Sequence, residues 1–322
     1  MATLQTYAIT LSQGACAMTN LSEADVTLAF RGQPHRRLAI GGSDIAYWRF
    51  GNGPDVVLVH GWPLHSATFR RIIPILARSF TLHAFDLPGT GQTIAGEGSS
   101  SHLLAHAETV KKIVDSLELS RYGVIAHDTG AAIARFAVAG DPRLAGLVMG
   151  NTEIPGHRPD GIELMMSASR LPGFSSFARA ALRVPMIRRS SRTFGGCFTD
   201  ANYADGEFGE LFIEPFIQSQ EVARGQMQLV KEFDLSLFDD LEACHRDIRV
   251  PTRCIWGPND PFFPIDKARG MLHQFAGGAG LVEIPGGKLF SHEDHPVEFA
   301  GHAGTFLSRC FSRTTAPIAM SA

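Results

Sequence analysis

The stretch Y-G-V-I-A-H-D-T-G-A, Tyr122 to Ala131, joins an apolar run to a turn of small residues and an alanine-rich segment. This pattern predicts a buried strand that leads through a tight turn into a helix. Ala126 and Gly130 each lie two residues from Asp128. That spacing is typical of a strained strand-to-helix turn that exposes its central side chain, so Asp128 is a candidate nucleophile.

Similar apolar runs occur along much of the chain. The β-rich stretches are 44–50, 55–60, 81–85, 122–127, 146–151, 250–256 and 280–284. Helical patterns lie among the later ones, at 102–117, 130–139 and 264–275. Apolar strands separated by helices indicate a parallel sheet covered on both faces. The predicted fold class is therefore α/β.

The alternation breaks between Pro155 and Leu237, where Phe, Met, Gly and Pro occur without a strand-like run. A helical insertion is predicted there, either as ordinary helical core or as a lid over an apolar pocket. The expected organisation is an N-terminal extension at 1–36, a core at 37–154 and 238–312, a helical cap at 155–237 and a tail at 313–322.

Composition narrows the range of partners. The 322 residues are 44% hydrophobic, with a formal net charge of −3 and no basic block, which argues against nucleic-acid binding. Five scattered cysteines and no spaced ligand cluster predict neither a metal nor another cofactor. With no signal-like or membrane-spanning run, we expect a cytoplasmic monomer or homodimer that does not bind membranes and takes an apolar small molecule.

Two further turns follow strand-like runs, H-G-W-P at 60–63 and D-L-P-G-T-G at 86–91. Ligands of parallel sheets bind beyond the carboxyl ends of the strands. The backbone N–H groups of Trp62 and Thr129 could therefore face one substrate oxygen. An isolated Asp before a helix is more often an N-cap, but the companion turns favour the catalytic interpretation of Asp128.

With I-W-G-P-N-D-P at 255–261 and P-G-G-K-L-F-S-H-E-D-H-P at 285–296, these motifs resemble the α/β-hydrolase superfamily. Within it they are similar to the aspartate-nucleophile branch of epoxide hydrolases and haloalkane or haloacid dehalogenases. The resemblance covers residues 37–311. It implies a mostly parallel eight-stranded sheet and a helical cap inserted after the sixth strand. It also implies that Asp128 attacks an sp3 carbon to form an ester, which water then cleaves.

In that family a histidine held by a carboxylate activates the water. Asp260 matches the position of the carboxylate. Glu153 resembles an alternative acid position, although it could equally be a solvated loop carboxylate.

The histidine itself is missing from its usual place. An ungapped alignment places Lys288 and Leu289 where Gly-His is usual, so the base position holds leucine. His292 follows three residues later as a candidate shifted base, and His295 is expected to face solvent. For both histidines, a structural role is the favoured interpretation.

Other positions depart from each named activity. Thr129 stands where dehalogenases have a halide-binding Trp, which leaves Trp62 as a candidate indole donor. Tyr203 is the single tyrosine of the predicted cap, where epoxide hydrolases use two, and it could equally be cap packing. Two histidines, His60 and His127, are candidate substrate-binding donors. For His127, as for His157, a structural role is the favoured alternative.

Two hypotheses from different classes remain. The first is a hydrolase of epoxides or alkyl halides that uses Asp128 and an atypical base. The second is an altered member of the fold that binds an apolar small molecule, or promotes a non-hydrolytic rearrangement or cyclisation. Leu289 is the feature that separates them. Asp128 disfavours a serine esterase.

Overall fold

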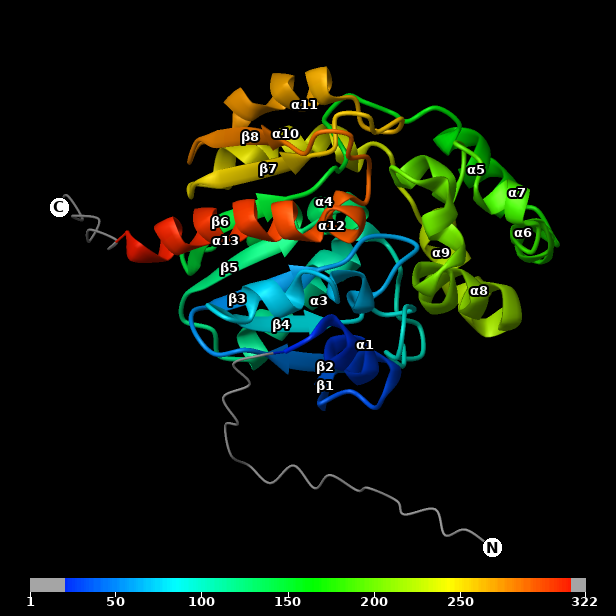
Figure 1. Ribbon diagram of the computed structural model, residues 1–322, viewed down its shortest axis with the longest axis horizontal. Helices are drawn as coiled ribbons and strands as arrows, with labels where there is room; N and C mark the ends of the chain where they lie inside the picture. The colour runs from blue at the N-terminus through cyan, green and yellow to red at the C-terminus, as the bar shows by residue number, and fades with distance from the viewer. Residues whose placement is uncertain (1–20, 314–322) are drawn as a thin grey trace, which may run out of the picture.

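The computed structural model describes residues 21–313 and contains one eight-stranded sheet (Figure 1). Its strand order is β1-β2-β4-β3-β5-β6-β7-β8. The two pairings β1/β2 and β2/β4 are antiparallel, and the remaining pairings are parallel. The strands are β1 (Arg36–Ile40), β2 (Ser43–Phe50), β3 (Asp55–Val59), β4 (Thr81–Phe85), β5 (Tyr122–Ala126), β6 (Leu144–Met149), β7 (Thr252–Trp256) and β8 (Ala279–Glu283).

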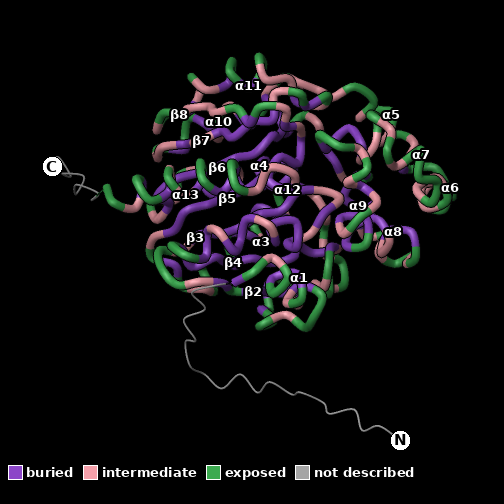
Figure 2. The backbone as a smooth tube through the Cα atoms, in the orientation of Figure 1, coloured by how far each residue is buried: buried purple, intermediate pink, exposed green. Residues whose placement is uncertain are grey.

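Helices cover both faces of the sheet, as the predicted α/β class requires (Figure 1). On one face α13 packs against α2, β6 and β7, and on the other α4 packs beside α3 and α10. The core helices are α1 (Glu23–Arg31), α2 (Ile73–Leu76), α3 (Leu103–Ser116), α4 (Asp128–Val138), α10 (Leu237–Asp247), α11 (Ile265–Met271), α12 (Ser291–Asp294) and α13 (Pro296–Ser312). The central strands β3 to β6 are buried nearly throughout (Figure 2), which explains the mainly apolar sequences of β3, β5 and β6.

The chain between β6 and α10 contains helices and turns but no strand. Its helices are α5 (Ile162–Ser169), α6 (Phe174–Leu182), α7 (Pro185–Arg188), α8 (Glu214–Gln218) and α9 (Gln220–Lys231), with short turns η2 (Phe194–Cys197), η3 (Ala201–Asp205) and η4 (Gly209–Ile213). Figure 1 shows this layer beyond the end of the sheet at which β5 and β6 finish.

The N-terminal region differs from the expected extension. Helix α1 begins with a capping box, in which Ser22 and Asp25 each accept a hydrogen bond from the other's backbone N–H. Phe30 is buried against Trp48, with ring centroids 5.0 Å apart. Residues 23–31 therefore pack on the core, and Arg36 already begins an edge strand. Most of the expected tail, and the start of the extension, lie outside the described residues.

Candidate active site at the strand–helix turn

Asp128 occupies the turn between β5 and α4 with φ = +50°. This left-handed region is costly for a side chain with a Cβ, so neighbouring contacts must hold it there. The Asp128 N–H donates to the carbonyl oxygen of Asn151 at 2.7 Å, and the Thr152 hydroxyl lies 2.8 Å from the Asp128 carbonyl oxygen. The start of the loop after β6 thus fixes both polar backbone groups of Asp128.

Two glycines make the turn sterically possible. A Cβ on Gly130 would lie 2.2 Å from the carbonyl oxygen of His60. A Cβ on Gly61 would lie 2.6 Å from Asp128 Oδ2. Both contacts are far too short for any side chain, so Gly130 packs directly on the backbone of the turn after β3, and Gly61 leaves room for the Asp128 side chain.

Asp128 is 7% exposed and Glu153 is 3% exposed, and the two carboxyl groups are close enough to interact. Burial, and then the charge of Glu153, raise the Asp128 pKa well above its usual range. The Thr129 backbone N–H, at the start of α4, opposes this shift. Burial likewise raises the pKa of Glu153, against the lowering effect of Arg135. Two buried carboxyls that repel each other favour retention of a proton.

Hydrogen-bond counting indicates which carboxyl holds that proton. The Thr152 hydroxyl oxygen lies 2.7 Å from Glu153 Oε2 and accepts a bond from Arg135 Nη2 at 2.9 Å. If Glu153 is protonated, it donates to Thr152, whose single proton then reaches the Asp128 carbonyl oxygen. If Glu153 is ionised, that single proton must serve two acceptors. The geometry therefore favours protonated Glu153 and ionised Asp128.

Asp260 lies beside the turn but bonds to amide groups. Its Oδ2 accepts from Asn151 Nδ2, and its Oδ1 from the Phe262 N–H, both at 2.7 Å. Burial raises the Asp260 pKa to about 7, against these hydrogen bonds. Because the Asn151 carbonyl holds the Asp128 N–H, Asp260 supports the nucleophile turn through Asn151.

The loop after β8 lies next to Asp260. Asn259 donates its backbone N–H to Gly287 at 3.0 Å, and Leu289 is 7% exposed. The Phe290 N–H donates to the carbonyl of Cys197 at 3.0 Å, which joins this loop to the helical layer. Among the described contacts of Asp260, none is with a histidine.

His292 is buried in α12, directly after the loop that carries Leu289. Its Nε2 lies 2.7 Å from the Thr68 hydroxyl, and its ring lies 4.0 Å from that of His127, centroid to centroid. Burial, and then the positive charge of Arg70, lower the His292 pKa to about 3. Burial also lowers the pKa of His127 well below its usual value. Within residues 21–313, no hydrogen bond connects either ring to Asp128 or Asp260.

The other candidate donors are engaged elsewhere. The indole N–H of Trp62 donates to the carbonyl of Gln226 on α9 at 2.8 Å, so it is not directed at a ligand. His60 accepts from the Leu87 N–H at 3.0 Å, and its Nδ1 lies 3.0 Å from the carbonyl of Gly61.

Tyr203 and the outer histidines also have protein partners. The Tyr203 hydroxyl accepts from Arg71 at 2.8 Å and contacts the buried Glu293. His157 bonds to the carbonyl of Phe262, and His295 to the hydroxyl of Thr199. These contacts tie the helical layer and nearby loops together.

Sequence reasoning missed Asn151, Thr152 and Arg135, although signals for them exist. Asn151 and Thr152 precede Glu153 directly after an apolar strand, and Arg135 is the single charged residue in α4 after Asp128. The Arg135 guanidinium is fully buried and also bonds to the carbonyl of Glu153 at 2.9 Å. A lone Arg in an apolar helix signals a buried acidic or carbonyl partner.

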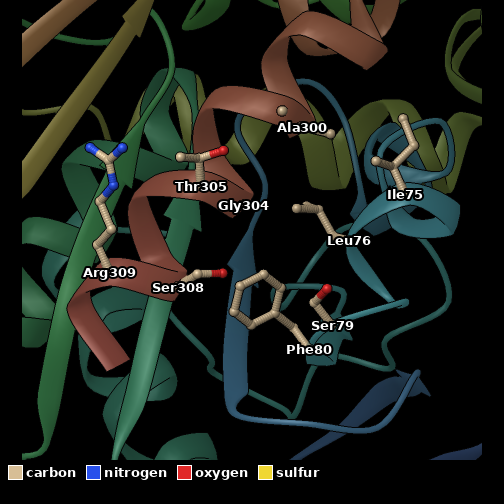
Figure 3. A pocket seen from close by; sticks show the side chains of 10 residues that line it. Ile75, Leu76, Ser79, Phe80, Ala300, Gly304, Thr305, Ser308 and Arg309 are labelled. Atoms are coloured by element: carbon tan, nitrogen blue, oxygen red, sulfur yellow. The ribbon is translucent and has the colours of Figure 1, made fainter. Parts of the chain in front are cut away.

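Two hollows are prominent, and neither is lined by Asp128. The larger, about 520 Å³, lies between α2 and α13 and includes Leu76, Phe80 and Arg309 (Figure 3). The smaller, about 260 Å³, is lined by His157 and Lys267. The carboxyl of Asp128 instead lies near Cys197 of the helical layer. Burial is the main cause that raises the pKa of the Cys197 thiol, and the charges of Asp260 and Asp128 add to it.

Residues 21–313 contain no cluster of three or more His, Cys, Asp or Glu side chains that is placed to hold a metal ion. None of the helices in this range has both the length and the apolar character needed to cross a bilayer.

The family model of the alpha/beta hydrolase fold matches residues 54–296, so the chain belongs to that family. A haloalkane dehalogenase of Mycobacterium bovis is 28% identical over 262 residues, which cover 80% of this chain and 88% of the relative. An epoxide hydrolase structure aligns with a TM-score of 0.71 at 19% identity, over 85% of this chain and 98% of the other.

A second solved structure, an alpha/beta hydrolase fold protein from Burkholderia ambifaria, also has a TM-score of 0.71, at 22% identity. The alignment covers 84% of this chain and 97% of the chain in that structure. At these identities the two structures establish the fold alone. The family match and the dehalogenase relative indicate a hydrolase without identifying its substrate.

Proposed function

We propose that this protein is a hydrolase of epoxides or alkyl halides with Asp128 as nucleophile. The observation that carries the proposal is the left-handed turn at Asp128, held by Asn151 and admitted by two glycines. A strained, over-determined turn that presents a buried carboxyl at a helix start suits attack on an electrophilic carbon. The helical layer at 155–237 would act as the cap that excludes water and binds an apolar substrate.

In the first step, one Asp128 oxygen attacks the sp3 carbon and forms an ester. An alkyl halide loses its halide with the bonding electron pair. An epoxide opens at the attacked C–O bond, and its oxygen takes a proton from Glu153. The Thr129 N–H stabilises the carboxylate before attack.

In the second step, water attacks the ester carbonyl and the product alcohol leaves. Glu153 is proposed as the acceptor of the water proton, because ester formation removes the Asp128 charge that keeps Glu153 protonated. After an epoxide opens, Glu153 is already ionised. After a halide leaves, it loses its proton to solvent. With Leu289 at the usual base position, this step is expected to be the slower one.

The test is intact mass of the protein after exposure to a reactive alkyl bromide and to an aryl epoxide. Wild type should form an ester adduct on the peptide that carries Asp128, and Asp128→Asn should form none. With the alkyl bromide, Glu153→Gln should accumulate the adduct and turn over at least about tenfold more slowly, because general-base help is worth ~10²- to 10⁴-fold. With the epoxide, the same variant should also form the adduct more slowly, because Glu153 is the proposed proton donor. An adduct on another residue would overturn the nucleophile assignment.

The second candidate function is binding, rearrangement or cyclisation without hydrolysis. Its supporting observation is that amide donors satisfy Asp260 while the base position holds Leu289. Absence of adduct and turnover with both probes, in a folded protein, would favour this alternative.

A further inference from the structure

Helix α6 presents apolar side chains to solvent. Phe174, Ala178 and Leu182 form its inner face and are partly buried. Phe177 and Ala180 on the helix, and Val184 just beyond it, are spaced three and four residues apart and exposed, so they form one outward stripe. Phe177 is 67% exposed. The helix therefore carries a second apolar face that no described part of the chain covers.

The exposed apolar surface continues on both sides of α6. Met186 on α7 is 79% exposed, and Leu164 and Leu171 before α6 are also exposed. Figures 1 and 2 show α6 and α7 at the outer end of the helical layer, far from the sheet.

The same segment is strongly basic. Residues 164–192 contain six arginines and no acidic residue, whereas the whole chain has a net charge of −3. Arg188 and Arg189 pair with Asp205. Within the described residues, no ion pair involves the side chains of Arg183 and Arg192, both of which are exposed. Uncompensated positive charge thus adjoins the exposed apolar stripe.

We propose that the tip formed by residues 164–192 docks on an anionic lipid surface. Arginines beside exposed Phe, Met and Leu match the chemistry of a bilayer interface, where phosphate groups lie next to acyl chains. A second copy of this chain fits less well, since its own tip would repel the arginines. The sequence has no membrane-spanning run, and from this we expected no membrane binding. Peripheral docking needs no spanning helix, so the proposal departs from that expectation.

The experiment is co-sedimentation of the full chain with vesicles. Vesicles of phosphatidylcholine containing about a third phosphatidylglycerol should bind the protein, and vesicles of phosphatidylcholine alone should bind it at least about tenfold more weakly. Added salt should weaken the binding. Arg183→Glu/Arg192→Glu and Phe177→Ser/Met186→Ser should each reduce binding by about tenfold or more. These residues are exposed, so folding, checked by circular dichroism, should be unchanged.

Matched variants elsewhere control for net charge and apolar content. Arg78→Glu/Arg309→Glu changes charge equally, and Leu28→Ser/Val297→Ser removes exposed apolar groups away from the tip. Both should bind like wild type. Equal binding to neutral and anionic vesicles, or equal loss in tip and control variants, would overturn the proposal. So would capture by polyglutamate beads without vesicle binding, which would indicate an acidic protein partner.

Discussion

Leu289 decides how the proposed ester would break down. The loop that carries it lies beside Asp260, whose carboxylate could accept a hydrogen bond from a histidine at this position. We expect Leu289→His to accelerate turnover of an alkyl bromide by ~10²-fold, within the range of general-base help. Single-turnover kinetics would measure loss of the adduct. If turnover does not change while His292→Ala abolishes it, His292 is the base instead.

The pH profile of adduct formation tests the carboxyl pair. Attack requires ionised Asp128, and burial together with Glu153 raises its pKa. A raised pKa means less carboxylate in acid, so the rate should still climb with pH well above ~4, where a free aspartate is already ionised. Glu153→Gln should leave the profile of bromide adduct formation in place, because protonated Glu153 carries no charge while Asp128 ionises. A shift of the profile to lower pH would show that Glu153 is the ionised member of the pair.

The turn between β5 and α4 depends on Gly130. A methyl group there would meet the carbonyl of His60 at 2.2 Å, so Gly130→Ala should lower the free energy of unfolding by about 2 kcal/mol or more. Gly301→Ala is the matched control, because nothing lies within 4 Å of its added Cβ on the exposed side of α13. It should raise stability by about 0.5 kcal/mol. Urea denaturation compares the two, and equal effects would refute the close approach.

Across the whole molecule, Trp62 connects the sheet to the helical layer. Trp62→Phe removes the indole bond to Gln226 and should ease opening of residues 155–237 by about 1 kcal/mol. Limited proteolysis should then cut that segment roughly fivefold faster, while the thermal midpoint changes little. Trp48→Phe removes a similar indole bond to Ala29 at the far edge and should not affect cleavage there. Equal acceleration by both variants would indicate general destabilisation.

The α/β class, seven of the eight strands and the turn at Asp128 could be predicted because they depend on local patterns. Apolar runs, helical spacing and small residues around a turn all act within about ten residues. Strand β1 was missed because its sequence, R-R-L-A-I, buries two of five residues at an edge. Helix α1 was missed because it spans only nine residues, although its capping box was present in the sequence.

The contacts that define the candidate site are set by long-range packing. Asn151 reaches both Asp128 and Asp260, Trp62 turns its indole toward α9, and the His292 ring lies against that of His127. Each partner lies tens to hundreds of residues away, or depends on which side of a strand a side chain leaves. Sequence spacing indicated which groups could do chemistry. Their protonation and their partners depend on burial, which exists only after the sheet and the helical layer have packed.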